Sequence, residues 1–309
     1  MKISKSLPVL VTGATGYIAG WVVKNLLDEG ITVHAPIRDL ANTQKRIHLD
    51  KLAEDSSGEI KYFESDLMIE DSYKEAMKGC ELVIHTASPF VMDSKDPQKE
   101  VIEPALKGTQ NVLKTVNETE SVKRVVLTSS VAAIYGNGID GQSVEGGMFN
   151  ESMWNTTSTS TDGEYSYSKT IAEKEAWKIC GEQKRWDLVV INPGFVLGPS
   201  LNPNALFESK KFMLQMGNGD LKSGAPDITM GMVDVRDVSQ AHVIAGFSET
   251  AKGRHILSAG THTLLETGGF IKEKFGDKYP VPTRNAPKFL IWILAPFIGV
   301  KRNFVSKNI

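Results

Sequence analysis

Short apolar runs alternate with amphipathic stretches through the first 200 residues of the chain. The apolar runs are almost continuously hydrophobic, as are strands buried on both faces of a parallel sheet, and the stretches between them place apolar residues at helical spacing. The pattern predicts strands at residues 8–13, 31–38, 60–67, 81–88, 122–130 and 186–194, with helices at residues 17–30, about 98–118 and about 164–184.

This alternation of strands and helices is the signature of an α/β fold. We expect a Rossmann-type doubly wound parallel sheet over residues 1–200, with helices on both faces. After residue 200, helical pieces mix with shorter strands at residues 230–237 and 254–260. This change of rhythm predicts a smaller C-terminal lobe over residues 201–309, which we expect to bind mainly the substrate.

The longest apolar stretch, residues 289–300, reads FLIWILAPFIGV and is interrupted by Pro296. It is shorter than the roughly 20 residues that a membrane-spanning helix needs. We therefore expect a C-terminal helix that packs on the fold. An interfacial anchor or a dimer surface is the alternative.

Composition narrows the classes of partner. A net charge of −2 gives no reason to expect nucleic acid or an anionic membrane. The two cysteines, Cys80 and Cys180, are too few for a disulfide framework and lack metal-ligand spacing. The N-terminal residues lack the apolar core of a signal peptide. We expect a cytoplasmic protein without a metal site, monomeric or homodimeric, that acts on a small molecule.

The first predicted strand ends in a glycine-rich turn, VTGATGYIAG. Gly13 permits a tight turn, Gly16 lets a phosphate approach the backbone, and the small Ala19 lets the helix pack on the strand. The following helix directs its free N–H groups and the positive end of its dipole at that phosphate. The turn predicts a dinucleotide site that includes Gly13, Thr15, Gly16, Tyr17 and Ile18.

The end of the second predicted strand indicates which dinucleotide binds. Arg38 stands where NAD-selective sites place an acidic residue, and an arginine there suits the 2′-phosphate of NADP. Lys45 can add a second cation. Asp39 leaves NAD as the alternative, and a solvated charge at a strand end is the alternative for Arg38.

Two further strand ends carry candidate cofactor contacts. Asp66 follows the third predicted strand, where it can accept a hydrogen bond from an adenine amino group or can simply form a turn. Thr86, Ala87 and Ser88 end the fourth strand. Their small side chains leave room for the ribose and diphosphate.

Among the seven tyrosines, Tyr165 is the one with a lysine four residues later. Tyr165 and Lys169 therefore share a helix face, whereas Tyr167 points elsewhere. An ammonium favours the phenolate and lowers the tyrosine pKa from its free value of roughly 10, which suits a general acid. The LTSS segment, residues 127–130, supplies a hydroxyl at the end of the fifth strand, where open α/β sheets bind ligands.

Nine motifs between about residues 7 and 265 together resemble the extended short-chain dehydrogenase/reductases. Within them the chain is most similar to the group of dihydroflavonol reductases, cinnamoyl-CoA reductases and yeast-type aldehyde or methylglyoxal reductases. The motifs stand in that family's order: VTGATGYIAG, PIRD, SDL, HTASPF, VKRVVLTSS, NESMW, YSYSKTIAEKEAW, NPGFVLGP and MVDVRDVSQAH.

The resemblance also implies tasks for individual residues. Ser129 is expected to pack or cap while its neighbour acts. The implied tasks are catalysis by Ser130, Tyr165 and Lys169, with the last two also contacting the cofactor; 2′-phosphate selection by Arg38 and Lys45; adenine contact by Asp66 and Leu67; nicotinamide contact by Pro193, Gly194 and Val196; and lining of the substrate pocket by Phe90 and Tyr135.

The implied activity is NADPH-dependent reduction of an aldehyde or ketone. Tyr165 would donate the proton, Ser130 would hold the carbonyl oxygen, and Lys169 would lower the tyrosine pKa. A nucleotide-sugar epimerase or dehydratase with tightly bound NAD is one alternative, and steroid dehydrogenase/isomerase chemistry is another. A regulator that binds NAD(P) without catalysis is an alternative of a different class.

Two departures from the family pattern bear on these expectations. Ala19 replaces the third glycine of the plant-type fingerprint, as it does in the yeast-type reductases. Members of the family usually continue past the position of Ile309 through a final strand or helix. The sequence leaves open whether the C-terminus is truncated or genuinely shortened, so the resemblance does not define the C-terminal wall of the substrate pocket.

Overall fold

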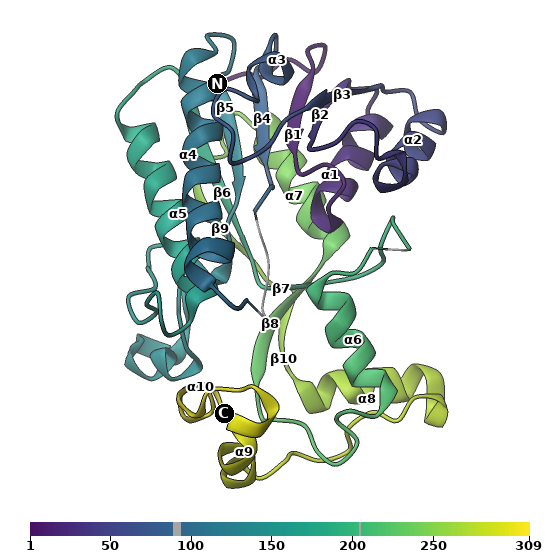
Figure 1. Cartoon of the computed structure of the whole chain (residues 1–309), viewed down its shortest axis with the longest axis vertical. Coiled ribbons are helices and arrows are strands. Elements are labelled where there is room, and N and C mark those ends of the chain that lie inside the picture. The colour runs from purple at the N-terminus through teal and green to yellow at the C-terminus, as the bar shows by residue number, and fades with distance from the viewer. Residues whose placement is uncertain (89–93, 204) are drawn as a thin grey trace.

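A seven-stranded parallel sheet forms the larger part of the molecule in a computed structural model, which describes residues 1–88, 94–203 and 205–309 (Figure 1). All neighbouring strands in it are parallel. The strand order is β3-β2-β1-β4-β5-β6-β9, formed by β1 (Val9–Thr12), β2 (Val33–Ile37), β3 (Ile60–Glu64), β4 (Leu82–His85), β5 (Arg124–Thr128), β6 (Asp187–Pro193) and β9 (Gly253–Leu257).

The six strands expected from the apolar runs are all present, and the doubly wound α/β fold is confirmed. Each strand is shorter than its apolar run, because residues at one or both ends of the run lie outside the sheet. In β4, for example, the residues after His85 turn away to bond with Thr12. The seventh strand, β9, lies in the part of the sequence whose mixed pattern suggested the smaller lobe.

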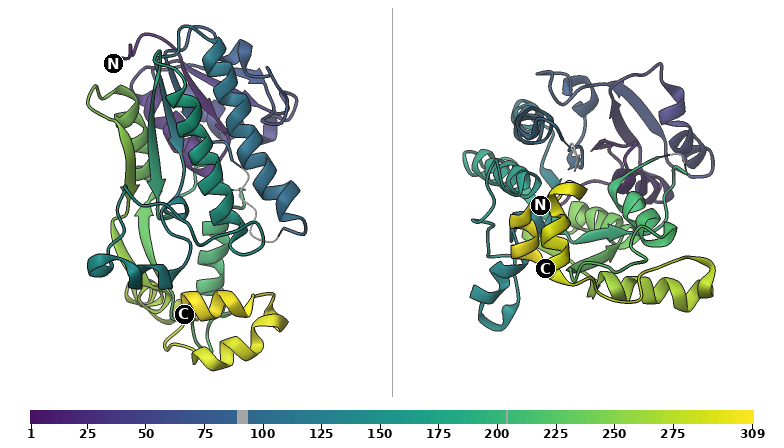
Figure 2. Two further views of the ribbon diagram at one scale, coloured as in Figure 1. Left: turned by 90° about the vertical axis from the view of Figure 1, so that its left-hand side faces the viewer. Right: turned by 60° about the horizontal axis from the view of Figure 1, so that its bottom comes forward.

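Helices cover both faces of this sheet. One face carries a hydrophobic cluster with α1 (Tyr17–Asp28), α2 (Ile47–Glu54) and α7 (Val235–Phe247). The other face carries a second cluster with α3 (Lys74–Met77), α4 (Glu103–Glu118) and α5 (Glu164–Gly181). Figure 2 shows α4 and α5 side by side along the sheet.

A smaller region lies beyond the lower end of the sheet in Figure 1. Its three-stranded sheet has the order β10-β8-β7, with β10 antiparallel to β8 and β7 parallel to it. Residues 235–257 return from this region to the large sheet as α7 and β9. The region contains β7 (Phe195–Leu197), β8 (Thr229–Asp234), β10 (Gly260–Thr263), α6 (Glu208–Asn218), α8 (Leu264–Phe275), α9 (Lys288–Leu294) and α10 (Arg302–Asn308).

Shorter turns of helix connect these elements. The segment rich in Gly, Ser, Thr and Asn at residues 137–163 forms such turns and otherwise remains irregular. A π-helical turn, Gln98–Ile102, leads into α4. The 3₁₀ turns are Thr43–Lys45, Val131–Ala133, Gly138–Ser143, Glu145–Gly147, Gly276–Lys278 and Ala295–Ile298.

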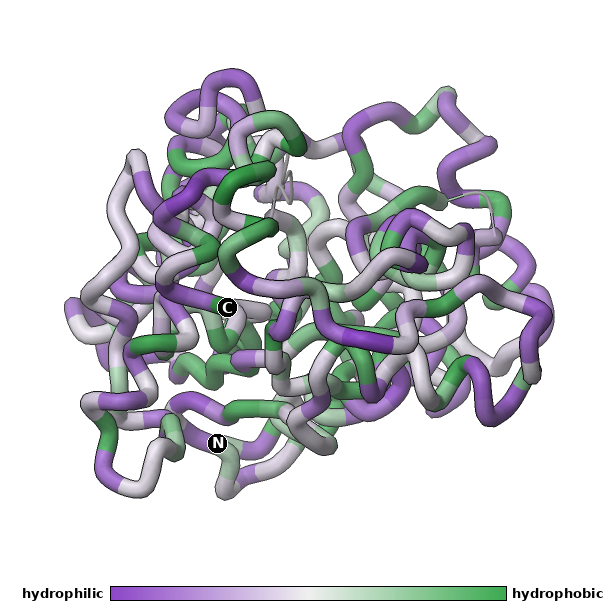
Figure 3. Tube along the Cα trace, turned by 90° about the horizontal axis from the view of Figure 1, so that it is seen from below, coloured by the Kyte–Doolittle hydropathy of each residue, from purple (hydrophilic) through white to green (hydrophobic). Residues whose placement is uncertain are grey.

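The prediction of a packed C-terminal helix is wrong for most of its apolar side chains. Pro296 follows α9, which ends at Leu294, and no residue of α9 is buried. Phe289 is 63% exposed and Phe297 is 84% exposed. Figure 3, which views the molecule from below, shows hydrophobic and hydrophilic positions mixed along this side. Within the described residues, every helix is too short or too polar to cross a membrane.

Arg124 ties two central strands to a covering helix. Its side chain, on β5, is fully buried, and it donates hydrogen bonds of 2.7 and 2.8 Å to the carboxylate of Asp187 on β6. Its Nη1 donates to the carbonyl oxygens of Ala245 and Ser248 at the end of α7. The guanidinium therefore satisfies carbonyls that would otherwise be left without donors at a buried helix end.

Replacing Arg124 by methionine should lower the free energy of unfolding by about 2 to 4 kcal/mol. The variant keeps an apolar chain of similar length but leaves Asp187 and the two α7 carbonyls without their donor. Urea unfolding measures the loss. Lys78→Met is the matched control, because the Lys78–Glu75 pair is exposed (69% and 74%) and its removal should cost less than about 1 kcal/mol. Equal losses in the two variants would show that Arg124 has no special structural role.

Candidate functional site

The residues singled out in the sequence gather at the carboxyl ends of the parallel strands. Gly13 follows β1, Arg38 follows β2, Thr86 follows β4 and Ser129 follows β5. Because the strands are parallel, these ends meet at one edge of the sheet. The chain passes from β6 into β7 through Gly194, so this edge faces the smaller region.

The glycine-rich turn between β1 and α1 has the geometry that its sequence predicts. Gly13 adopts a φ of +68°, and a Cβ there would lie 3.0 Å from the Cα of Ala87. The N–H of Gly16 donates to the carbonyl of Gly13 at 2.8 Å. The N-cap residue of α1 is Gly16, which has no side chain, and within the described residues the start of this helix has no side-chain cap hydrogen bond.

A buried hydrogen-bond network joins the ends of β1 and β4 beside this turn. The Thr12 hydroxyl lies 2.8 Å from Nδ1 of His85 and accepts hydrogen bonds from the N–H groups of Thr86 and Ala87. The Thr86 hydroxyl donates to the Thr12 carbonyl. Burial lowers the pKa of His85 to about 3, helped by the charge of Lys169, so the imidazole is neutral. Thr86 and Ala87 thus lie beside the turn, and Ser88 follows them.

The cations predicted to select the cofactor are both exposed near the end of β2. Arg38 is the residue after this strand, and Lys45 ends the 3₁₀ turn Thr43–Lys45. The carboxylate of Asp39 accepts a hydrogen bond from the N–H of Ala41 at 2.9 Å and so stabilises a turn. The guanidinium and the lysine therefore present positive charge to solvent at this edge, whereas Asp39 is engaged locally.

Asp66 and Leu67 lie in the turn after β3. One carboxylate oxygen of Asp66 accepts a hydrogen bond from the N–H of Met68 at 2.7 Å, which is the turn-forming role that the sequence left open. The carbonyl of Leu67 accepts from Asn111 on α4 at 2.7 Å. Burial raises the pKa of Tyr73, the charge of Asp66 adds to the rise, and the charge of Arg38 opposes it. The charges of Arg38 and Asp66 therefore both act on Tyr73.

Ser130, Tyr165 and Lys169 come together at the end of β5. Tyr165 lies in the first turn of α5, and Lys169 lies one turn later, with its Nζ 5.8 Å from the centre of the Tyr165 ring. Burial raises the pKa of Tyr165 to about 12, and a hydrogen bond with the Ser130 side chain opposes the rise. Burial lowers the pKa of Lys169 to about 8, and the charge of Glu173 opposes that shift.

Ser129 and Ser130 have different partners, in keeping with the different tasks that the family resemblance implies for them. The Ser129 hydroxyl is buried and donates to the carboxylate of Glu173 at 2.5 Å. The Ser130 hydroxyl accepts from the N–H of Ala132, which starts the 3₁₀ turn Val131–Ala133. The second serine therefore faces Tyr165, and the first faces the interior.

Sequence reasoning missed a buried polar cluster beneath these groups. Glu173, on α5, accepts hydrogen bonds from Asn192 on β6 at 2.8 Å and from Arg254 on β9 at 2.6 Å. Asn192 also donates to the carbonyl of Ser130 at 3.1 Å. The position of Glu173 four residues after Lys169, on the same helix face, was a signal that could have identified it. No local pattern marked Arg254.

The segment predicted to lie beside the nicotinamide forms the connection from β6 to β7. The N–H of Gly194 donates to the carbonyl of Leu257 on β9 at 2.9 Å, and a Cβ at Gly194 would lie 2.3 Å from the carbonyl oxygen of Gly231. Glycine is therefore required for the close passage of the two sheets. Pro193 ends β6, and Val196 lies in β7.

Tyr17 turns its side chain away from the glycine-rich turn. Its hydroxyl donates to the carbonyl of Gly198 at 2.8 Å, and its ring stacks on Phe207 with centres 4.0 Å apart. The side chain thus holds the segment after β7 against α1. Thr15 and Ile18, on either side of Gly16 and Tyr17, belong to the turn and to the start of α1.

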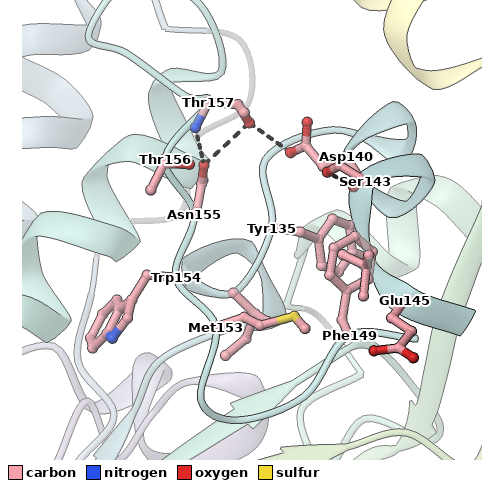
Figure 4. A pocket seen from close by; sticks show the side chains of 12 residues that line it. Tyr135, Asp140, Ser143, Glu145, Phe149, Met153, Trp154, Asn155, Thr156 and Thr157 are labelled. Carbon is pink, nitrogen blue, oxygen red and sulfur yellow. Dashed lines mark hydrogen bonds between the residues drawn. The ribbon is translucent and has the colours of Figure 1, made fainter. Parts of the chain in front are cut away.

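Tyr135 lines a pocket of about 380 Å³ within residues 134–157 (Figure 4). Its ring stacks on Phe149 with centres 4.3 Å apart, and burial raises its pKa. Asp140 and Thr157 close one side of the pocket through a 2.6 Å hydrogen bond. Phe90, the second residue expected in the substrate pocket, lies outside the described residues.

Across the described chain, no three His, Cys, Asp or Glu side chains converge as metal ligands.

Comparison with known proteins agrees with this arrangement. Residues 10–256 match the 3-beta hydroxysteroid dehydrogenase/isomerase family. Cinnamoyl-CoA reductase CAD2 of Medicago truncatula is 42% identical over 252 residues, 81% of this chain and 75% of that protein. Tetraketide alpha-pyrone reductase 1 of Arabidopsis thaliana is 36% identical, over 89% of this chain and 83% of that protein. Gre2 of Candida albicans, solved in complex with NADPH, superposes with a TM-score of 0.78 at 29% identity, covering 98% and 97% of the two chains.

Gly13→Ala should destabilise the protein by about 2 to 4 kcal/mol. Alanine must adopt a positive φ there, and its methyl group would press on the backbone of Ala87. Gly79→Ala is the control, because Gly79 has a φ of +75° but nothing within 4 Å of its added Cβ. That control should lose about 1 to 2 kcal/mol in urea unfolding, from the backbone alone. If Gly13→Ala lowers the free energy of unfolding no more than Gly79→Ala does, the added methyl group makes no costly contact with the backbone of Ala87.

Proposed function

Because the chain belongs to the 3-beta hydroxysteroid dehydrogenase/isomerase family, within the extended short-chain dehydrogenase/reductases, we propose that it is an NADPH-dependent carbonyl reductase. Its substrate is an aldehyde or a ketone. The convergence of Ser130, Tyr165 and Lys169 at the sheet edge carries the proposal. The reductase names of its relatives and the NADPH bound to Candida albicans Gre2 support it.

The residues at the sheet edge fit NADPH. The close approach of Gly13 to Ala87 leaves no side chain between the turn and the end of β4, and the uncapped start of α1 suits a diphosphate. When bound, NADPH supplies the hydride. Its proposed holders are Gly13, Thr15, Gly16, Tyr17 and Ile18 for the diphosphate, Arg38 and Lys45 for the 2′-phosphate, Asp66 and Leu67 for the adenine, Thr86, Ala87 and Ser88 for the riboses, and Tyr165, Lys169, Pro193, Gly194 and Val196 around the nicotinamide.

The proton for the product alcohol comes from Tyr165. Burial raises the pKa of Tyr165 to about 12, so the lowered pKa expected from Lys169 is wrong for this state; the phenol is fully protonated at neutral pH and holds the proton that the reaction needs. Ser130 hydrogen-bonds the carbonyl oxygen and holds it beside the phenol as negative charge develops. The ammonium of Lys169, on the same helix face, stabilises the phenolate left behind and so lowers the cost of the transfer.

The substrate enters between the two regions of the chain. Residues 1–200 supply the cofactor site and all three catalytic groups, and residues 201–309 mainly form the substrate-binding lobe. Within the latter, α7 and β9 instead complete the cofactor domain. We assign Tyr135 to the wall of the substrate pocket, on the loop that follows Ser130.

Tyr165→Phe should lower kcat by at least about 100-fold, because the proton donor is lost. The NADPH dissociation constant, measured by the cofactor's fluorescence, should change little. Tyr167→Phe is the matched control, since Tyr167 lies on another face of α5, and its turnover should stay normal. NADPH oxidation with a panel of small aldehydes, keto esters, aromatic ketones and aromatic thioesters measures both. Normal turnover in Tyr165→Phe would exclude Tyr165 as the proton donor. If none of the carbonyl compounds in the panel supports NADPH oxidation by the wild-type protein, the proposed reductase activity is contradicted.

Arg38→Ala should reduce the preference for NADPH over NADH by about 10- to 100-fold, since one charge-assisted hydrogen bond to the 2′-phosphate is lost. The ratio of kcat/KM for the two cofactors measures it. Lys51→Ala, which removes an exposed cation from α2, should leave the ratio unchanged. An unchanged ratio in Arg38→Ala would remove this residue from the cofactor site. NAD that remains bound to the wild-type protein through purification would favour the alternative function, a nucleotide-sugar epimerase or dehydratase.

A further inference from the structure

Arg254 holds the buried carboxylate of Glu173 and the loop after Ser130 at the same time. Its side chain is 7% exposed and that of Glu173 is 0% exposed. Besides Glu173, the guanidinium donates to the carbonyls of Ala133, Glu151 and Met153. Its Cζ also lies 3.9 Å from the ring centre of Trp154. One ion pair thus connects α5 and β9 with the loop that contains Tyr135.

The same carboxylate reaches every part of the chain that contributes a catalytic group. Glu173 lies one helical turn after Lys169 and two turns after Tyr165. Ser129, which donates to it, directly precedes Ser130, and Asn192 joins it to the carbonyl of Ser130. A shift of Glu173 would therefore move the serine relative to the tyrosine.

The charges around Lys169 assign a second role to Glu173. The charge of Lys169 acts on the neutral imidazole of His85 at the end of β4, and its Nζ lies 5.8 Å from the centre of the Tyr165 ring on α5. Arg254 on β9 contributes a positive charge through its pair with Glu173. Among the described residues, Glu173 is the acidic group whose charge acts on Lys169, and it favours the ammonium form.

We propose that Glu173, clamped by Arg254, is a positioning residue of the reduction: it keeps the Lys169 ammonium charged and holds Ser130 in place opposite Tyr165. This inference rests on the proposed function, because positioning is defined by the reaction. A buried ion pair is a poor device for stability alone, since its desolvation offsets most of its attraction. Its connection to all three catalytic groups accounts for its presence.

Glu173→Gln tests the charge while keeping the side-chain shape. Without the carboxylate, and with Arg254 left unpaired, the Lys169 ammonium is less favoured and releases its proton at lower pH. The alkaline limb of the pH profile of kcat for reduction should therefore move down by about one pH unit or more. A purely structural role would lower stability without moving this limb.

Two further variants separate charge from shape. Glu175→Gln makes the same change on α5 at a carboxylate that faces Gln110 and Lys178, and it should leave the limb in place. Arg254→Lys keeps the positive charge but loses the forked contacts to the loop carbonyls. It should lower kcat about tenfold or more through misplacement, with the limb unmoved. This variant also tests the proposal if Glu173→Gln does not fold.

A readout that needs no substrate completes the experiment. Trace acetylation of Lys169 by acetic anhydride, followed by peptide mass spectrometry across a pH series, reports the lysine's own titration. The midpoint should fall in Glu173→Gln and stay in Glu175→Gln. Identical midpoints and limbs in wild type and Glu173→Gln would overturn the proposal, as would unchanged kcat in Arg254→Lys. A fallen midpoint in a protein that reduces no carbonyl would support the charge role and overturn the proposed function instead.

Discussion

The buried carboxylate of Glu173 is the interaction on which the candidate site depends. It receives the Ser129 hydroxyl from the end of β5, an amide from β6 and a guanidinium from β9, while its own backbone belongs to α5. A carboxylate in an apolar interior is stable only when such donors surround it, so the four elements must meet at one spacing. Tyr165 and Lys169 belong to α5, and Ser130 follows β5 by two residues. Their mutual placement thus follows from the need to satisfy one buried charge.

The parallel sheet supplies the second constraint. Because every strand runs in the same direction, its carboxyl ends collect the glycine-rich turn, the exposed cations after β2, the Thr12–His85 network and the two serines along one edge. The edge can serve a dinucleotide because Gly13 passes close to Ala87 and α1 begins there without a side-chain cap. The sheet also requires Gly194, where the chain crosses from the large sheet to the small one beneath Gly231.

Much of this could be predicted from local pattern. The six strand runs, the glycine-rich turn and the spacing of Tyr165 and Lys169 are each set within a few residues, where periodicity and backbone geometry decide the outcome. The packed C-terminal helix was predicted wrongly, because an apolar run indicates that a surface can be buried but not that a partner surface is near. Tyr135 was identified on its loop, but its stacking on Phe149 depends on a turn fourteen residues later, which no periodicity encodes.

The sequence by itself determined the α/β class, the glycine-rich turn, the family and the helix face that Tyr165 shares with Lys169, since each rests on neighbours in the chain or on motif order. Only the tertiary structure decided that β9 joins the large sheet and that Arg254 meets Glu173 from 81 residues away. It also gave the two serines their partners, since Ser129 donates to Glu173 and Ser130 accepts from the N–H of Ala132. The physical reason is the same in each case. Buried charges and hydroxyls bond to whichever partners the packing of distant elements brings within hydrogen-bond distance, and the local spacing of residues does not predict those partners.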